Sequence, residues 1–193
     1  MAGATPTARE QPLPTLYECR PARLTDAVAY RSYVAECADA GLPLYQVAQF
    51  DPDGWLEALL DHATGHNLPS GYPTTTTYFA LDAGEILATL RLRHGDNEAS
   101  QQWLGHIGYE TRPSRRGEGA ASLLLGWVQQ HILSEPVLVS CDERNQASRR
   151  VIAKAGGVWL ARRFHPGDRC WLAMYRIFPL APSDRTRPNI TSR

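Results

Sequence analysis

Several features that mark special classes of protein are scarce or missing in this sequence of 193 residues. Lysine occurs once, at Lys154, so arginine supplies almost all of the positive charge. The formal net charge at pH 7 is zero, and the basic excess that is typical of nucleic-acid binders is therefore absent. No apolar run reaches the length that a membrane span requires. The sequence predicts a protein with no nucleic-acid partner and no membrane partner.

Cysteines are few and far apart, and no C-x-x-C pair occurs among Cys19, Cys37, Cys141 and Cys170. This spacing predicts neither a zinc site nor a disulfide framework. The first residues, MAGATPTAREQPLP, lack the apolar segment of a signal peptide. We therefore expect reduced thiols, a cytoplasmic location and no metal.

The length is sufficient for one domain with a sizeable core. We place that domain at residues 16–178. The segments 1–15 and 179–193 are rich in small and polar residues, and we predict that they are disordered, loose tails.

Hydrophobic patterning predicts a mixed α/β fold. A helix is expected from residue 25 to Gly41, a loop over 42–52, a helix over about 54–64 that Asp53 caps, and helices over 119–134 and from Asn145 to Gly156. Strands are expected at 16–24, 76–81, 86–93, 103–111, 137–141, 158–164 and 170–177. The short apolar run 137–141 is typical of a buried parallel strand, so the sheet contains one strand–helix–strand crossover at its centre.

A glycine-rich loop precedes the helix over 119–134. It reads Arg115-Arg116-Gly117-Glu118-Gly119-Ala120-Ala121. A helix start leaves backbone amides without partners, and the helix dipole is positive there. Glycine and alanine allow an anion to approach that backbone closely, while the two arginines add positive charge. The loop therefore predicts a site for a phosphate or pyrophosphate.

Two common phosphate-binding motifs fit this loop poorly. A nucleoside-triphosphate loop requires a lysine after its last glycine, whereas Lys154 is far away in the sequence. A dinucleotide-binding loop requires a third glycine or alanine, and Ser122 stands there. Asp142 nevertheless occupies the place of a ribose-binding acid, so the nicotinamide dinucleotide alternative stays open.

The segment from Arg116 to Ala121 resembles the [Q/R]-x-x-G-x-[G/A] signature of the GNAT superfamily of N-acyltransferases. The stretches GHIGYETRPSRRGEGAASLLL, VSCDERNQASRRVIAKAGG, NLPSGYPTTTTYFALD and LRLRH look like one bacterial subgroup of that superfamily. The resemblance covers about residues 16–177. It implies the GNAT fold, in which a mostly antiparallel sheet of about seven strands has splayed central strands and is flanked by about four helices.

The resemblance also implies acetyl-CoA as the co-substrate. In GNAT proteins the pyrophosphate lies on the amides of the signature loop, the pantetheine arm pairs with the preceding strand, and the next helix adds an Asn. The cofactor-binding residues expected on this basis are Tyr109, Glu110, Thr111, Arg115, Arg116, Gly117, Glu118, Gly119, Ala120, Ala121, Asn145 and Ser148.

The resemblance further implies direct attack of an amine on the thioester without a covalent enzyme nucleophile, and the sequence contains no G-x-S-x-G elbow that would mark one. His106 is the predicted catalytic base, since an imidazole titrates near neutral pH. Glu110 lies on the same strand face and is predicted to be a second base or an amine-binding carboxylate. A backbone N–H near Glu110 or Thr111 is expected to stabilise the oxyanion.

The general acid differs from the family pattern. Many GNAT enzymes carry a tyrosine on the last helix that protonates the leaving thiolate, and Ile152 occupies that place here. The alternatives that remain are a replacement acid, which is Tyr109, Cys141, Tyr175 or a water molecule, and departure of the thiolate without protonation.

The sequence thus predicts an acetyl-CoA-dependent N-acetyltransferase that acts on a primary amine of a small molecule, such as an amino acid, an amine metabolite or an aminated antibiotic. A homodimer is compatible with this prediction. A CoA-binding module of the same fold without transferase activity is the alternative that the Ile152 substitution supports.

Overall fold

The computed structural model describes residues 17–180. The predicted tails 1–15 and, apart from two residues, 179–193 lie outside this range. The described chain forms a seven-stranded sheet in the order β1-β2-β3-β4-β5-β7-β6. The strands are β1 (Glu18–Pro21), β2 (Thr75–Asp82), β3 (Glu85–Arg93), β4 (Ile107–Thr111), β5 (Val137–Asp142), β6 (Val158–His165) and β7 (Cys170–Ile177).

Five α-helices occur in the described range. They are α1 (Ala27–Asp39), α2 (Pro43–Ala48), α3 (Pro52–Thr64), α4 (Ala120–His131) and α5 (Gln146–Lys154). Short 3-10 turns cover Leu24–Asp26 and Pro113–Arg115, and a short π-helical turn covers Ser100–Leu104. No helix of residues 17–180 is both long and apolar enough to cross a membrane.

The predicted crossover is confirmed. Strands β4 and β5 are parallel and are joined through α4, whereas every other neighbouring pair of described strands is antiparallel. The hairpin of β2 and β3 is also confirmed, with Asp82 paired to Glu85 across its turn. The fold is therefore the mixed, mostly antiparallel α/β fold that the sequence predicts.

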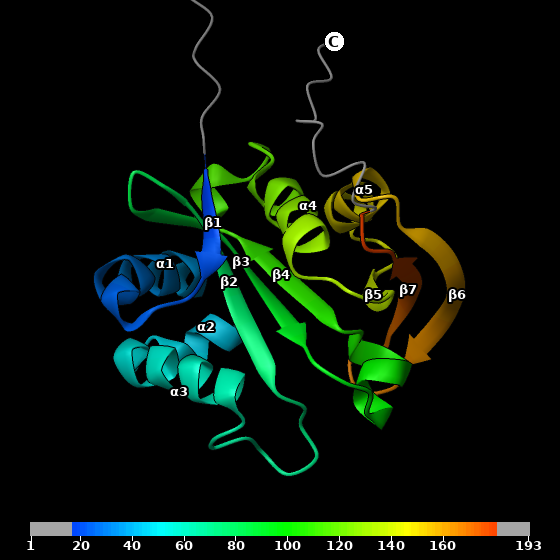
Figure 1. The fold of residues 1–193 in the computed structure, drawn as a ribbon, viewed down its shortest axis with the longest axis horizontal. Coiled ribbons are helices and arrows are strands. Elements are labelled where there is room, and N and C mark those ends of the chain that lie inside the picture. The colour runs from blue at the N-terminus through cyan, green and yellow to red at the C-terminus, as the bar shows by residue number, and fades with distance from the viewer. Residues whose placement is uncertain (1–16, 181–193) are drawn as a thin grey trace, which may run out of the picture.

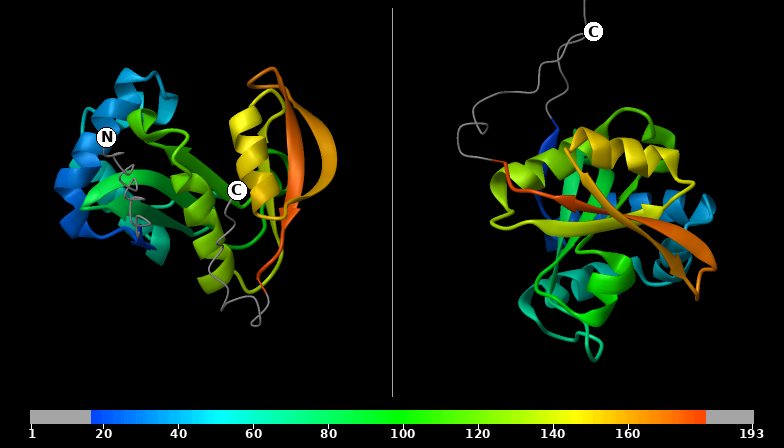
Figure 2. Two further views of the ribbon diagram at one scale, coloured as in Figure 1. Left: turned by 90° about the horizontal axis from the view of Figure 1, so that it is seen from above. Right: turned by 90° about the vertical axis from the view of Figure 1, so that its right-hand side faces the viewer.

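The helices form two layers, one on each face of the sheet (Figure 1). Helices α1, α2 and α3 pack against one face through a cluster that contains Tyr33, Leu56 and Phe79, none of which is exposed. Helices α4 and α5 cover the other face. Figure 2 shows α5, β6 and β7 at the opposite end of the molecule from α1–α3, so β4 and the start of α4 lie between these two groups.

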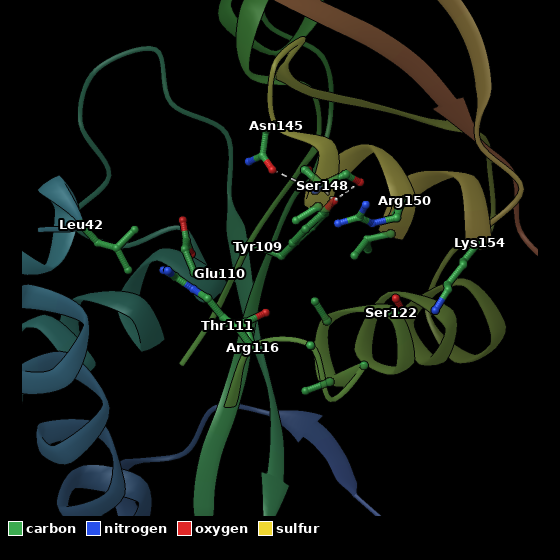
Figure 3. A pocket seen from close by; sticks show the side chains of 16 residues that line it. Leu42, Tyr109, Glu110, Thr111, Arg116, Ser122, Asn145, Ser148, Arg150 and Lys154 are labelled. Carbon is green, nitrogen blue, oxygen red and sulfur yellow. Dashed lines mark hydrogen bonds between the residues drawn. The ribbon is translucent and has the colours of Figure 1, made fainter. Parts of the chain in front are cut away.

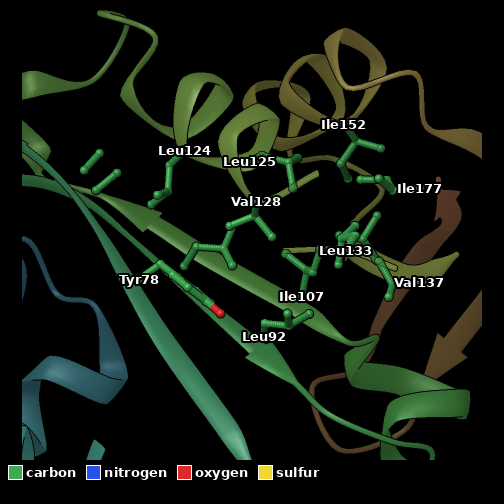
Figure 4. Close-up of a cluster of buried hydrophobic side chains, with 14 of the residues drawn as sticks. Tyr78, Leu92, Ile107, Leu124, Leu125, Val128, Leu133, Val137, Ile152 and Ile177 are labelled. Carbon is green, nitrogen blue, oxygen red and sulfur yellow. The ribbon is translucent and has the colours of Figure 1, made fainter. Parts of the chain in front are cut away.

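The larger core lies between α4, α5 and the sheet (Figure 4). The predicted apolar face of α4 supplies Leu124, Leu125 and Val128, all with no exposed surface. Burying side chains of this size contributes about 1.5–3 kcal/mol each. This packing fixes the start of α4 beside the end of β4, where the glycine-rich loop lies.

The segment 42–52 is not the loop that the sequence suggested. Pro43 begins α2, and Asp51, rather than Asp53, caps α3 by accepting a hydrogen bond from the Gly54 amide at 3.0 Å. Proline is favourable at the first position of a helix because its missing N–H would have no partner there. Pro43 and Pro52, which the sequence pattern placed in a loop, are thus the first residues of α2 and α3.

The predicted strand 103–111 is also too long. Residues Ser100–Leu104 form a π-helical turn, and β4 begins only at Ile107. At Gly105 the backbone has a φ of +63° and lies so close to β5 that a Cβ atom would be 2.8 Å from the Leu138 oxygen. Only glycine fits this contact, and the chain turns here before it enters the sheet.

Candidate functional site

Strands β4 and β5 separate soon after they meet. Their register consists of one pair, Ile107 with Val139. On its other side β4 pairs with β3 over its whole length. Hydrogen bonds from Arg93 N–H to the His106 carbonyl and from Arg112 N–H to the Leu87 carbonyl bracket this ladder.

The antiparallel ladder decides which backbone groups of β4 are available. Residues that bond to a given neighbour alternate along a strand. His106 and Arg112 bond to β3, so the residues between them at the same spacing, Gly108 and Glu110, bond to β3 as well. The N–H and C=O groups of the alternate residues, Tyr109 and Thr111, therefore point toward β5. Beyond Ile107 the splay leaves these groups without a strand partner.

A cleft of about 660 Å³ opens where the strands separate (Figure 3). Its walls come from the end of β4, the glycine-rich loop, the first turn of α4 and one side of α5. The lining residues are Leu42, Tyr109, Glu110, Thr111, Arg116, Gly117, Gly119, Ala120, Ala121, Ser122, Asn145, Ala147, Ser148, Arg150, Val151 and Lys154. A ligand in this cleft would lie against unpaired backbone on two sides.

The loop before α4 has the geometry of an anion site. Gly117 and Gly119 have φ values of +89° and +90°, a conformation that favours glycine. The first hydrogen bond of α4 runs from the Leu123 amide to the Gly119 carbonyl at 3.0 Å. Within residues 17–180 the amides of residues 117–122 have no hydrogen-bond partner, and the positive end of the helix dipole lies there.

The two arginines of the loop have different surroundings. Arg116 lines the cleft. Arg115 instead forms ion pairs with Asp82, Glu85 and Glu118, at 3.2, 2.6 and 2.8 Å. Neither Arg115 nor Glu118 is among the lining residues. The side chain of Arg115, expected at the rim of the site, is engaged in these ion pairs, whereas the contact expected of Glu118 is through its backbone amide.

Helix α5 forms the second wall. Asn145 caps it by accepting a hydrogen bond from the Ser148 amide at 3.0 Å, as its place before a helix predicted. The Tyr109 hydroxyl lies 2.7 Å from Ser148 Oγ and 3.1 Å from the Ser148 carbonyl. Burial raises the pKa of Tyr109 to about 12, although the hydrogen bond to Ser148 opposes this shift.

Two basic side chains of this wall were not predicted as site residues. Arg150 and Lys154 lie one helical turn apart on α5 and both line the cleft. Their i, i+4 spacing after the Asn145 cap was the signal available in the sequence. The spacing alone does not show which side of α5 faces the glycine-rich loop, and the fold decides this.

Glu110 belongs to a polar cluster on the opposite face of β4, toward α1 and α2. Its carboxylate accepts hydrogen bonds from Arg91, from the Tyr45 hydroxyl at 3.3 Å and from the Thr89 hydroxyl at 3.3 Å. The Tyr33 hydroxyl donates to the Glu110 carbonyl at 3.3 Å. The carboxylate is thereby held in one orientation while still lining the cleft.

His106 lies elsewhere. Its Nδ1 accepts a hydrogen bond from the Leu138 amide at 3.1 Å, and its Nε2 lies 2.8 Å from Asp96 Oδ1. The side chain is 10% exposed and is not among the lining residues of the cleft. Both ring nitrogens are thus hydrogen-bonded, and the ring links the turn before β4 to β5 and to Asp96.

Ile152, at the place of the usual family tyrosine, has no exposed surface and packs in the core beside α4. Among the replacements, Tyr109 lines the cleft. Cys141 is buried, which raises the pKa of its thiol, and the Tyr175 hydroxyl accepts a hydrogen bond from Arg149 at 3.2 Å. No group of three or more His, Cys, Asp or Glu side chains in the described range could hold a metal ion.

Comparison with known families gives one match. The profile described as acetyltransferase (GNAT) domain matches residues 19–158. A comparison with curated protein sequences gives no match.

Solved structures with a similar fold include three acetyltransferases. RimL, described as a ribosomal L7/L12 alpha-N-protein acetyltransferase in complex with coenzyme A, is 20% identical, with coverage of 87% of this chain and 97% of its own and a TM-score of 0.64. RimJ of Mycobacterium smegmatis, in complex with CoA-disulfide, is 18% identical, with 86% of each chain covered and a TM-score of 0.65. The ribosomal-protein-S5-alanine acetyltransferase of Vibrio fischeri is 19% identical, with 84% and 93% covered and a TM-score of 0.63.

Proposed function

The chain belongs to the GNAT family of acetyltransferases, and we propose that it transfers an acetyl group from acetyl-CoA to the α-amino group of an amino acid or a peptide. The splay of β4 and β5 next to an anion-binding helix start carries this proposal. The family assignment removes the nicotinamide dinucleotide alternative that the loop sequence left open.

The donor would occupy the cleft. The amides of residues 117–122 suit its pyrophosphate, and Arg116, Arg150 and Lys154 add positive charge for phosphate groups. The strand edge of Tyr109 and Thr111 offers amide partners to the pantetheine arm. Two of the solved structures with this fold contain coenzyme A or a CoA-disulfide, which supports the same class of donor here.

The acceptor amine would lie near Glu110. This carboxylate reaches the cleft, and its hydrogen bonds to Arg91, Tyr45 and Thr89 hold it in place. It is suited to bind an ammonium group and to take its proton directly or through water. We therefore place the base at Glu110, because His106 lies outside the lining of the cleft with both ring nitrogens engaged.

The thioester carbonyl and the leaving sulfur need separate donors. The Thr111 N–H points toward β5 without a strand partner, so it can donate to the developing oxyanion. The Tyr109 hydroxyl can donate to the leaving sulfur, since its raised pKa keeps it protonated at neutral pH. Attack by the amine, loss of its proton to Glu110 and departure of CoA as the thiolate or thiol complete the transfer.

The proposal of an α-amino group as the acceptor rests on two observations. The sequence favoured a small molecule such as an amino acid, whereas RimL and the Vibrio fischeri protein are described as acetylating ribosomal proteins, at an α-amine or an alanine. An α-amino group is common to both kinds of acceptor. At 18–20% identity the likeness concerns the fold, so the choice between a free amino acid and a peptide belongs to experiment.

The test measures thiol release from acetyl-CoA with a panel of amino acids, peptides and other primary amines. Glu110→Gln should lower kcat by about 100-fold, because a positioned general base typically contributes that much or more. The KM for acetyl-CoA should stay unchanged in this variant. His106→Gln should lower kcat far less than Glu110→Gln.

Two results would contradict the proposal. A larger loss of kcat in His106→Gln than in Glu110→Gln would show that His106, and not Glu110, is the catalytic base. Binding of CoA without acetyl transfer to any amine of the panel would favour the non-catalytic module.

A further inference from the structure

Two arginines of β3 lie on the same face as Glu110. Arg91 pairs with Gly108 in the register of β3 and β4, and Arg93 follows two residues later. A methyl group placed on Gly108 would lie 3.6 Å from Arg93 Nη2 and 3.8 Å from Arg91 Nη2. The two guanidinium groups therefore lie side by side over Gly108 and border the small space that a side chain at this position would take.

Positive charge exceeds negative charge around this space, because Arg91 has an ion-pair partner and Arg93 has none in the described range. Arg91 forms an ion pair with Glu110. Arg93 donates a hydrogen bond to the Gly105 carbonyl at 3.3 Å, and within residues 17–180 it has no ion pair. A guanidinium carries five N–H donors, so most of those on Arg93 are available.

Arg93 is a partly exposed residue. The fully buried polar side-chain atoms without a partner in the described range are Thr77 Oγ1 and Arg112 Nη2, and no atom of Arg93 is among them. Burial and the neighbouring charge of Arg91 lower the pKa of Arg93. An anion beside Arg93 would offset both effects.

The space over Gly108 adjoins the proposed amine position. Gly108 and Glu110 are two residues apart on one strand, which corresponds to roughly 7 Å. Tyr72, whose phenol contributes to the electrostatic environment of Arg93, lines a second hollow of about 450 Å³ together with Asn97 and Trp103. Arg93, beside Gly108, therefore lies within reach of an acceptor whose amine is at Glu110.

We propose that Arg93, with Arg91 beside it, binds a carboxylate of the acceptor and so selects amines that carry an acidic group close to the reacting nitrogen. This inference rests on the proposed transferase function. The carboxylate is either the α-carboxylate of a free amino acid or the side chain of an acidic first residue in a peptide. A forked guanidinium recognises either one by the same paired hydrogen bonds.

Matched acceptors separate the two sources. One pair is L-alanine and L-alaninamide, and the other is Asp-Ala-Ala-amide and Asn-Ala-Ala-amide. The wild-type enzyme should favour the acidic member of at least one pair by about tenfold in kcat/KM, a difference of about 1.4 kcal/mol. The pair that shows the preference identifies the source of the carboxylate.

Variants connect the preference to Arg93. Arg93→Gln should remove it by raising the KM of the acidic acceptor, with the neutral acceptor and acetyl-CoA unaffected. Arg93→Lys keeps the charge and should retain part of the preference. Arg31→Gln is the matched control, because Arg31 forms an exposed ion pair with Asp53, far along the sequence from β3 and β4.

The inference is overturned if the wild-type enzyme shows no preference in either pair, or if Arg93→Gln and Arg93→Lys lower the use of acidic and neutral acceptors equally. Binding is measured in parallel, as thermal stabilisation of the CoA-loaded protein by each acceptor. Arg93-dependent stabilisation by an acidic acceptor without any turnover would support the carboxylate site and contradict the transferase function. Absence of both readouts would contradict both proposals.

Discussion

The phenol of Tyr109 lies inside the cleft and is hydrogen-bonded to Ser148 on α5. In the proposed reaction this residue would face the donor, whereas the carboxylate of its neighbour Glu110, on the opposite face of the same strand, would face the acceptor. Successive side chains of a strand point to opposite faces, so two adjacent residues can serve the two reactants of one transfer.

Tyr109→Phe should lower kcat by about 100-fold, because the leaving sulfur loses a donor while the shape of the cleft is kept. The pKa of Tyr109 is raised to about 12, so its hydroxyl stays protonated below that pH. The pH–rate profile of the variant should therefore keep its shape up to about pH 10. Ser148→Ala, which removes the partner but leaves the phenol, is the control. A new inflection near neutral pH in Tyr109→Phe would contradict this role.

Helix α5 depends on its first residues for stability and for its place in the site. The Asn145 cap satisfies the Ser148 amide, and the next two turns present Arg150 and Lys154 to the cleft. A change in the cap therefore affects both the stability of the helix and the wall that faces the donor.

Asn145→Ala should lower the free energy of unfolding by about 1 kcal/mol, the usual contribution of a helix cap. Asn145→Ser should restore this stability, since serine also caps helices well. If the amide also contacts the pantetheine arm, the KM for acetyl-CoA should remain raised in Asn145→Ser. Chemical unfolding and steady-state kinetics measure the two effects.

Asp51→Ala is the matched control, because it removes the cap of α3 and should lower stability without changing that KM. If the KM for acetyl-CoA in Asn145→Ser equals that of the wild-type enzyme, Asn145 caps α5 and does not contact the pantetheine arm.

The stability of the whole molecule should depend on pH through Asp26. Its side chain is 5% exposed and accepts hydrogen bonds from Arg20, at 2.8 and 2.7 Å, and from the Arg23 amide at 2.8 Å. Burial alone would raise the pKa of Asp26, but these contacts outweigh it and the pKa is lowered. A lowered pKa in the folded state contributes stability above the unfolded value of about 4, and this stability is lost as the pH falls below it.

Asp26→Asn should therefore lower the free energy of unfolding by about 3 kcal/mol at pH 7, as expected when a buried ion pair loses one partner. The difference from the wild-type protein should shrink as the pH falls below about 4, where Asp26 of the unfolded chain binds a proton while folded Asp26 stays charged until the pH reaches its lowered pKa. Urea unfolding at several pH values provides the measurement. A difference that is the same at pH 7 and pH 3 would show that the charge of Asp26 is not responsible.

The sequence by itself determined the features that depend on neighbouring residues. The glycine-rich loop, the Asn145 cap, the hairpin of β2 and β3 and the apolar face of α4 are local patterns, and the structure contains all of them. Such patterns are legible because backbone conformation and hydrophobic period are set over a few residues. The same local reasoning assigned strand to residues 103–106, where a close contact between Gly105 and β5 turns the chain instead.

Only the tertiary structure decided which side chains meet. His106 and Glu110 are equivalent by strand period, yet Glu110 reaches the cleft while the ring of His106 is held by Leu138 and Asp96. The proximity of Arg91 and Arg93 over Gly108 likewise depends on the register of β3 with β4. Register, splay and the approach of distant elements arise from packing of the whole sheet and its helices, so no local pattern in the sequence encodes them.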